Sequence, residues 1–434
     1  MKVLVIDADS VGLPISMAAQ KAGHTVRLWQ PPSDIGKGLV TKVDAWRPLM
    51  GWADLILTTD NSKLINDLEP YFKQKYPIFG CNKEAGTWEL DREKGQEVLQ
   101  ECNIETLPYE VFDSYDAAIK YVKQTNETYV SKPWGGNPDK SLSYVSKSPA
   151  DMVFKLERAK KKGKMQGKMF LQKAVEGGVE MAVGGWFGPG GWLSPINENW
   201  EEKRLMNDGK GPNTGEMGTV MRYVDRSKLF KKVLQPVTEK LKETGYCGYV
   251  DMNCIIGKDG KPWPLEFTMR FGWPHFNLCM TLHEGDPVDW MGDLLAGKDT
   301  LKWKKDICVG VVMAHGHFPW KEPQEADVVG FPLEGLKRGM MKDLRLTSVM
   351  WGSAPVMDGG KVVDKKTFLT AGNYVLVATG LGATVEGARR ATYAIADEIT
   401  WPGDIIYRTD IGNRLEGMLP KLQQHGYATG LAYE

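Results

Sequence analysis

The chain is short of cysteine and has no net charge, and each shortage excludes a class of protein. Its six cysteines contain no CxxC pair, so we expect neither a zinc site nor a disulfide framework, and a reducing compartment instead. Lysine plus arginine and aspartate plus glutamate both number 55 among 434 residues. This balance gives no overall field that would attract DNA, RNA or an anionic membrane.

Long apolar runs are also missing. No stretch of about 18 or more apolar residues is present. The first residues, MKVLVIDAD, lack the charged start and cleavage site of a secretion signal. We therefore expect a cytoplasmic protein without a membrane partner. The length predicts two to four domains.

Strand and helix signals alternate near the N-terminus. Residues 3–6, 25–29, 52–60 and 76–80 are typical of strands, and residues 15–22 of a helix. This alternation predicts an α/β fold with a parallel sheet covered by helices. Further along, Gly-rich residues 176–188 indicate a hairpin, and residues after 300 predict short strands followed by one helix at 385–399.

Two acidic residues lie on a predicted hairpin. Asp251 and Glu266 belong to strands joined by a tight turn at residues 258–260. Facing side chains of an antiparallel pair lie within about 5.5 Å of each other. Two such carboxylates suit Mg²⁺ bound together with nucleotide phosphates. The alternative is a pair of exposed acids on an amphipathic hairpin.

Two further segments carry groups that suit an anion or a small polar substrate. Lys132 precedes a glycine loop that ends near Lys140, and ammonium and backbone N–H groups suit phosphate oxygens. The sequence GPNTGEMG at 211–218 predicts a tight loop. The alternatives are a surface lysine beside a turn and a plain Ω-loop.

Together these segments resemble the phosphoribosylamine–glycine ligase family of the ATP-grasp superfamily. The likeness runs in order through residues 79–122, 201–218 and 265–274, and through NYVLVATGLGATVEGARRATYAI and YRTDIGNRL near the C-terminus. The resemblance implies a pre-ATP-grasp α/β domain at 1–85, an ATP-grasp domain at 86–300 with a lid at about 127–185, and a β-rich C-terminal domain at 301–434.

The resemblance also implies roles for particular residues. It places ATP against Arg92, Lys132, Lys140, Gln172, Lys173 and Glu180. It places Mg²⁺, or Mn²⁺ in its stead, on Asp251, Glu266 and Thr268. It assigns Arg270 and Lys132 to catalysis, and Asn213, Thr214, Gly215, Glu216 and His275 to the substrates. The implied reaction makes an acyl phosphate from a carboxylate and passes the acyl group to an amine, giving an amide, ADP and phosphate.

The sequence departs from the family pattern where the substrates are expected to bind. The first loop, DADSVGLP at 7–14, has two acids in place of a glycine-rich segment, and acids repel phosphate. Glu216 replaces a glycine, Thr268 an asparagine, and residues 273–275 an acidic pair. We therefore predict a ligase that joins glycine or another amino acid to an altered amine.

Several alternatives stay open. One is the ordinary family reaction, and another is an ATP-binding protein without catalysis. A modified base in DNA remains open as the amine, although nucleic acid is otherwise not expected, and the protein is expected to be a monomer or homodimer. His275 is either an acid–base group or a structural histidine. His315 and His317 are expected on one side of a strand, where a metal pair is the less favoured interpretation.

Overall fold

The computed structural model describes residues 1–133, 144–163, 168–320 and 325–434. Residues 1–79, the N-terminal unit, form a parallel sheet in the order β2-β1-β3-β4. Its strands are β1 (Lys2–Ile6), β2 (Thr25–Trp29), β3 (Leu55–Thr58) and β4 (Ile78–Phe79), and its α-helices are α1 (Leu13–Lys21) and α2 (Ile65–Lys73). The predicted parallel sheet is thus confirmed.

Alternating apolar side chains let this sheet bury both faces. Val3 and Val5 point into a core shared with α1, whereas Leu4 and Ile6 point into a second core with α2. Such two-sided burial is typical of parallel sheets. Helices α1 and α2 therefore cover opposite faces of this sheet.

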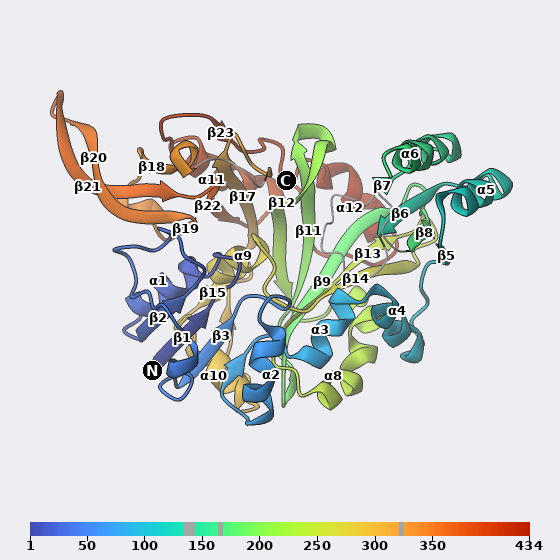
Figure 1. The fold of residues 1–434 in the computed structure, drawn as a ribbon, viewed down its shortest axis with the longest axis horizontal. Coiled ribbons are helices and arrows are strands. Elements are labelled where there is room, and N and C mark those ends of the chain that lie inside the picture. The colour runs from blue at the N-terminus through green and yellow to red at the C-terminus, as the bar shows by residue number, and fades with distance from the viewer. Residues whose placement is uncertain (134–143, 164–167, 321–324) are drawn as a thin grey trace.

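Residues 109–173 form the lid unit, a separate antiparallel sheet in the order β5-β8-β6-β7. Its elements are β5 (Tyr109–Phe112), α5 (Tyr115–Thr125), β6 (Tyr129–Pro133), β7 (Tyr144–Val145), α6 (Pro149–Lys161) and β8 (Met169–Lys173). Helices α3 (Lys83–Leu90) and α4 (Arg92–Glu101) precede it. The lid unit lies at the side of the molecule opposite the projecting hairpin of β20 (Val349–Asp358) and β21 (Lys361–Ala371) (Figure 1).

A large sheet forms the centre, in the order β14-β13-β9-β11-β12-β17-β22-β19, with β10 and β23 at its side. Its strands are β9 (Val179–Gly188), β10 (Gly191–Trp192), β11 (Ile196–Met206), β12 (Lys210–Val224), β13 (Gly248–Ile256), β14 (Pro262–Thr268), β17 (Ile307–His315), β19 (Leu344–Leu346), β22 (Tyr374–Gly382) and β23 (Ile405–Ile406). Strands from the predicted ATP-grasp and C-terminal regions thus share one sheet.

Helices cover the two faces of the central sheet. One face packs in a core with α11 and α12, and the other with α9 and α10. The remaining helices and strands are α7 (Lys228–Val233), α8 (Thr238–Thr244), α9 (His275–Leu282), α10 (Asp289–Leu295), α11 (Val385–Ala396), α12 (Leu415–Gln423), β15 (His283–Glu284), β16 (Lys302–Trp303), β18 (Val329–Pro332), β20 (Val349–Asp358) and β21 (Lys361–Ala371). Among the described residues, no helix is long and apolar enough to cross a bilayer.

Some expectations from the sequence are wrong in detail. Gly184 and Gly185 lie inside the continuous strand β9 rather than in a turn. The GPNTGEMG segment belongs to β12 rather than to a loop. The sheet of the lid unit includes β5, which begins at Tyr109 and pairs with β8. The domain boundaries themselves stay a prediction.

Candidate functional site

The face of the central sheet that packs against α9 carries a buried polar network. Asn199 Nδ2 and Tyr249 Oη each donate to Asp251 Oδ2 at 2.9 Å. Tyr249 Oη lies 2.5 Å from His275 Nε2, and Asn197 Nδ2 donates to that hydroxyl at 2.9 Å. All five side chains are buried. Shared hydrogen bonds of this kind restrict the position of each member.

Gly184 on β9 makes room for this network. A Cβ at this position would lie 2.0 Å from Tyr249 Oη and 2.7 Å from Asp251 Oδ2. Any side chain would therefore push the tyrosine and the aspartate away from the strand. The glycine that resembles a turn residue in the sequence is instead required for close approach inside a strand.

The register of the β13–β14 hairpin corrects the predicted carboxylate pair. Thr268 lies opposite Asp251, and Asn253 lies opposite Glu266, so the two acids are diagonal neighbours. Diagonal pairs are about 7–8 Å apart, farther than directly facing residues. The expected turn at residues 258–260 is present, with Gly260 N–H donating to Gly257 O at 2.9 Å.

Burial dominates the chemistry of Asp251. It raises the pKa of the carboxyl to about 7, and the nearby carboxylate of Glu201 adds to the effect. The hydrogen bonds from Tyr249 and Asn199 and the charge of Lys203 act in the opposite direction. Burial also lowers the pKa of His275 to about 4, so its imidazole is neutral at pH 7.

A second group of residues meets between α4, β8 and β14. Arg92, Gln172 and Glu266 line one pocket together with apolar neighbours such as Phe267. An Arg92 guanidinium nitrogen lies 3.8 Å from a carboxylate oxygen of Glu266. The structure thus brings together two predicted nucleotide residues and one predicted metal ligand.

Arg270 continues this group toward the N-terminal unit. Its guanidinium lies 3.3 Å from Glu89 Oε1, while Glu89 Oε2 accepts from Met269 N–H and Asn61 Nδ2. The charge of Glu89 raises the pKa of Arg270, and Asp9 and Asp60 of the N-terminal unit contribute. A positive group therefore stands where the N-terminal unit meets the central sheet.

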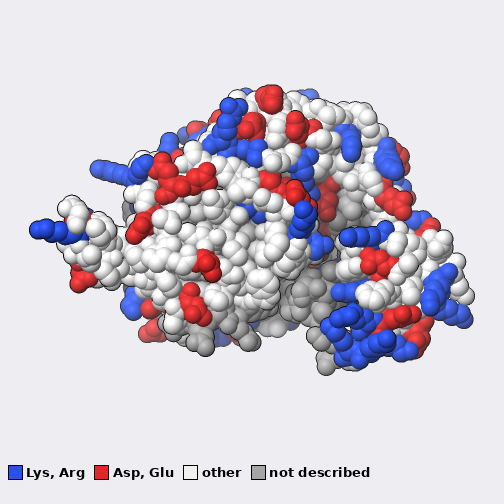
Figure 2. Space-filling model, turned by 90° about the horizontal axis from the view of Figure 1, so that it is seen from above, with Lys and Arg blue, Asp and Glu red and all other residues white. Residues whose placement is uncertain are grey.

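The other predicted nucleotide residues are more scattered. Lys132 lies on β6 opposite Phe170 of β8, and Lys140 lies outside the described residues. Lys173 is exposed and pairs with Glu127. Glu180 is exposed on β9, 3.8 Å from Arg414. Figure 2 shows basic side chains gathered on the lid unit, where α6 ends with Arg158, Lys160 and Lys161.

A wide bulge in β12 shapes the predicted substrate segment. Asn213 pairs with Arg204 and Gly218 with Glu202, so Lys203 alone faces the four residues between Asn213 and Gly218. Thr214 Oγ1 donates to Lys203 O at 2.9 Å, and Gly215 is exposed. The Gly, Pro and Asn residues that predict a loop thus produce a bulge within a strand.

The bulge places Glu216 in the interior. Its side chain is 5% exposed, and among the described residues its Oε1 has no hydrogen-bond partner. Burial raises the pKa of this carboxyl well above its usual range, and the charges of Glu201 and Asp251 add to the effect. A buried carboxyl oxygen without a hydrogen bond costs folding free energy, and a ligand that donates to it would remove that cost.

Glu201, Lys203 and Asn253 have no role among those predicted from the sequence. Lys203 Nζ lies 3.0 Å from Glu201 Oε2, and Asn253 Nδ2 donates to the same oxygen at 3.0 Å. Burial lowers the pKa of Lys203, but the charges of Glu201, Glu266 and Glu180 outweigh it, so the net shift is upward. The alternation of residues 197, 199, 201 and 203 on β11 is the signal that places them on one face.

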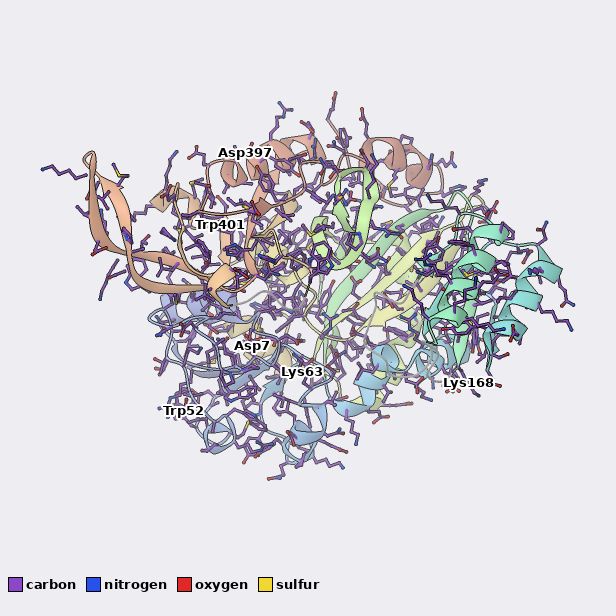
Figure 3. All side chains as sticks on the ribbon, turned by 45° about the horizontal axis from the view of Figure 1, so that its top comes forward. Asp7, Trp52, Lys63, Lys168, Asp397 and Trp401 are labelled. Carbon is purple, nitrogen blue, oxygen red and sulfur yellow. The ribbon has the colours of Figure 1, made fainter. Side chains whose placement is uncertain are left out.

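The first loop differs from its predicted role. Asp7 accepts hydrogen bonds from Val11 N–H, Gly12 N–H and Thr59 Oγ1 at 3.0, 2.7 and 2.8 Å. Asp9 pairs with Lys63 at 2.5 Å. Figure 3 shows Asp7 and Lys63 close together in the N-terminal unit. Asp7 therefore stabilises the loop through hydrogen bonds inside it. Its carboxylate is a weaker argument against phosphate binding at this loop than the sequence indicates.

The predicted histidine pair does not form on one strand. His315 ends β17, is buried, and accepts from Trp401 Nε1 at 3.3 Å, whereas His317 lies in the turn that follows. Among the described residues, the group with metal-ligand spacing is His24, Asp286 and Asp289, which already includes a 2.8 Å ion pair. A metal held by His315 and His317 therefore has no support.

Comparison with known proteins gives two family models in chain order. The ATP-grasp (A) domain of phosphoribosylglycinamide synthetase matches residues 91–276, and the C domain matches residues 308–414. A phosphoribosylamine–glycine ligase of Escherichia coli O157:H7 is 26% identical over 443 residues, covering 95% of this chain and 98% of its own length. The Salmonella typhimurium enzyme is 26% identical over 349 residues, 78% of this chain and 77% of its own.

Solved structures agree on the fold. The phosphoribosylamine–glycine ligase of Thermotoga maritima superimposes with a TM-score of 0.72 at 20% identity, over 95% of this chain and 100% of its own. A biotin carboxylase–ATP complex from Campylobacter jejuni gives 0.61 at 14% identity, over 98% and 97%. The expected ATP-grasp fold is therefore confirmed.

Proposed function

Because the chain belongs to the phosphoribosylglycinamide synthetase family of ADP-forming carbon–nitrogen ligases, we propose that it joins glycine to phosphoribosylamine. The observation that carries this proposal is the meeting of Arg92, Gln172 and Glu266 in one pocket beneath the lid unit. A cation, a polar side chain from the lid and a carboxylate are the groups that a nucleotide with its metal requires.

The carboxylate oxygens of Asp251 and Glu266 suit a hard divalent cation, and Mg²⁺ is the ion we propose. Glu266 is the principal ligand, because Asp251 Oδ2 is already occupied by Asn199 and Tyr249. Thr268, directly opposite Asp251, offers a hydroxyl oxygen on the same side. When bound, the ion supplies charge that offsets the phosphates during transfer.

The protein's own cations complete the charge balance. The carboxylate substrate attacks the γ-phosphate of ATP and ADP leaves, and the negative charge of the transferring group needs fixed positive partners. Arg270, oriented by Glu89, is proposed for this task together with Lys132 of the lid unit. The resulting acyl phosphate then reacts with a neutral amine, which releases phosphate and forms the amide.

Substrate recognition is proposed for the β12 bulge and α9. Asn213, Thr214 and Gly215 border the bulge, and Glu216 points into the interior. His275 is proposed to position substrate through Tyr249 rather than to exchange protons, because its Nε2 is already engaged. Lys173 and Glu180 remain proposals for the nucleotide.

A second candidate function has one specific observation in its favour. The buried, unpartnered Oε1 of Glu216 lies where the family resemblance leads us to expect glycine, and it would accept hydrogen bonds from a nitrogen of an amine other than phosphoribosylamine. This altered-amine ligase shares the nucleotide chemistry and differs in the acceptor.

A coupled ADP-release assay tests both. Glycine and phosphoribosylamine are supplied together, and a panel of other amines replaces phosphoribosylamine in parallel reactions. Turnover with phosphoribosylamine supports the first proposal; turnover with another amine alone supports the second. Glu266→Gln should reduce turnover by about 10²-fold or more, whereas the exposed control Glu243→Gln should not change it. Absence of ADP release with every pair would refute both.

A further inference from the structure

A cavity of about 740 Å³ lies between the N-terminal unit and the C-terminal strands. It is lined by α1, α9, the segment around Gly285 and residues 341–346, and it shares no lining residue with the pocket that contains Arg92 and Glu266. Ligand sites for drug-sized molecules occupy about 300–1,000 Å³. The cavity therefore has the size of an organic ligand and a place outside the proposed nucleotide site.

The walls of this cavity are mostly apolar. Met17 and Ala18 come from α1, Phe276 and Met280 from α9, and Leu344 and Leu346 from β19. Because three elements distant in sequence form the walls, a ligand bound in the cavity would contact all three. Such walls favour a hydrocarbon or aromatic group.

The charged groups at the cavity all have one sign. Lys21, Lys342 and Arg345 line it, and no aspartate or glutamate is among the lining residues. The Arg345 guanidinium donates to Lys342 O at 2.7 Å, Leu344 O at 3.3 Å and Thr281 Oγ1 at 2.7 Å. These partners are neutral, and within the described part of the chain Arg345 has no carboxylate at ion-pair distance.

The Arg345 guanidinium has neutral hydrogen-bond acceptors and, among the described residues, no carboxylate in direct contact. Burial lowers the pKa of Arg345, and the charge of Asp343, through space, acts in the opposite direction. Partly buried arginines are ordinarily matched by carboxylate or phosphate, which their planar donors fit in pairs. The missing counter-charge is therefore the feature that a ligand would supply.

We propose that this cavity binds an organic anion with an apolar body and one carboxylate or phosphate group. The acidic group pairs with Arg345 and Lys342, and the body lies against Met17, Phe276 and Met280. The site is independent of the proposed ligase reaction. It adjoins that reaction's site through α9, which carries wall residues of the cavity and His275 of the buried network.

Calorimetric titration of the full chain with octanoate and octyl phosphate tests the proposal. Either ligand should bind at least tenfold more tightly than octanol, which lacks the charge, and than acetate, which lacks the body. The stronger of the two identifies the preferred acid. Failure of both to bind, or octanol binding as tightly as they do, overturns the proposal.

Two variants locate the binding. Arg345→Gln should weaken the better ligand about tenfold, the effect of losing a charge-assisted hydrogen bond, while the exposed control Lys361→Gln should not. Ala18→Trp places an indole in the cavity and leaves every hydrogen bond of Arg345 in place. It therefore tests whether the ligand binds in the cavity even if Arg345→Gln fails to fold. Unchanged affinity in Ala18→Trp contradicts the assignment.

Discussion

At the scale of single residues, the buried carboxyl of Glu216 lowers the stability of the protein and offers a hydrogen-bond acceptor to a substrate. Its carboxyl is buried near Glu201 and Asp251, and its Oε1 lacks a partner among the described residues. Removing the acid should therefore stabilise the free protein, as substitutions at binding sites often do. The same change should weaken whichever substrate supplies the missing donor.

Substitution of Glu216 separates these effects. Glu216→Gln should raise the melting temperature and increase the KM of the amine about tenfold, with the KM of ATP unchanged. Glu216→Gly restores the residue expected from the family resemblance and should favour phosphoribosylamine over other amines. Steady-state kinetics with each substrate varied in turn measure this. An equal rise in every KM would indicate a general structural effect instead.

Asp251 should make stability depend on pH. Its folded pKa is raised from 3.8 to about 7, so the protonated carboxyl contributes stability that is present below pH 4 and is lost as pH rises toward 7. The Asp251→Asn variant has no ionisable carboxyl at this position, so it does not lose stability in this way. Its melting temperature relative to wild type should therefore increase between pH 4.5 and 7.5, by about 1–3 °C. The exposed control Asp225→Asn should show no such trend.

At the scale of elements, sequence patterns predict the strands and turns that depend on short-range interactions. The strands around Val3 and Ile56 and the turn at residues 258–260 follow from short-range signals, and the structure contains them. The β12 bulge does not follow, because it depends on the register with β11, and the need for Gly184 inside β9 does not follow, because it depends on Tyr249 and Asp251, more than 50 residues away. Asn197, Asn199 and Tyr249 were missed for the same reason: their pairing exists only after the sheet forms.

The close approach at β9 gives a test with a matched control. Gly184→Ala would bring a methyl group into Tyr249 and Asp251, so it should destabilise the protein by about 1–3 kcal/mol. Gly215→Ala, at a position with nothing within 4 Å, should leave the melting temperature nearly unchanged. Comparable melting of both variants would contradict the close contact.

At the scale of the whole molecule, strand pairing joins regions that the sequence places in separate domains. β12 pairs with β17 over residues 218–222 and 307–311, and β22 pairs with β17 on its other edge. The two large cores also draw residues from both sides of residue 300, whereas the lid unit has a core of its own. Strands on the two sides of the predicted boundary at 300 are therefore hydrogen-bonded in one sheet.

Truncation tests this dependence. A fragment ending at residue 300 would leave the edge of β12 unpaired and its apolar neighbours uncovered, so it should aggregate on expression. Shortening the projecting β20–β21 hairpin by residues 354–365 should leave a soluble monomer or dimer, because most of its tip is exposed. Size-exclusion chromatography distinguishes the outcomes, and a well-folded fragment 1–300 would contradict the shared-sheet argument.

The lid sheet, unlike the central sheet, is built from one continuous segment of the chain, since its described strands all pair within residues 109–173. Homologous genes that recombine at the two ends of this block would exchange it without altering a single ladder of the central sheet. A crossover between β12 and β17, by contrast, would require both parents to share the same strand register. Chimaeric enzymes with a transplanted lid are therefore the ones that should survive such shuffling.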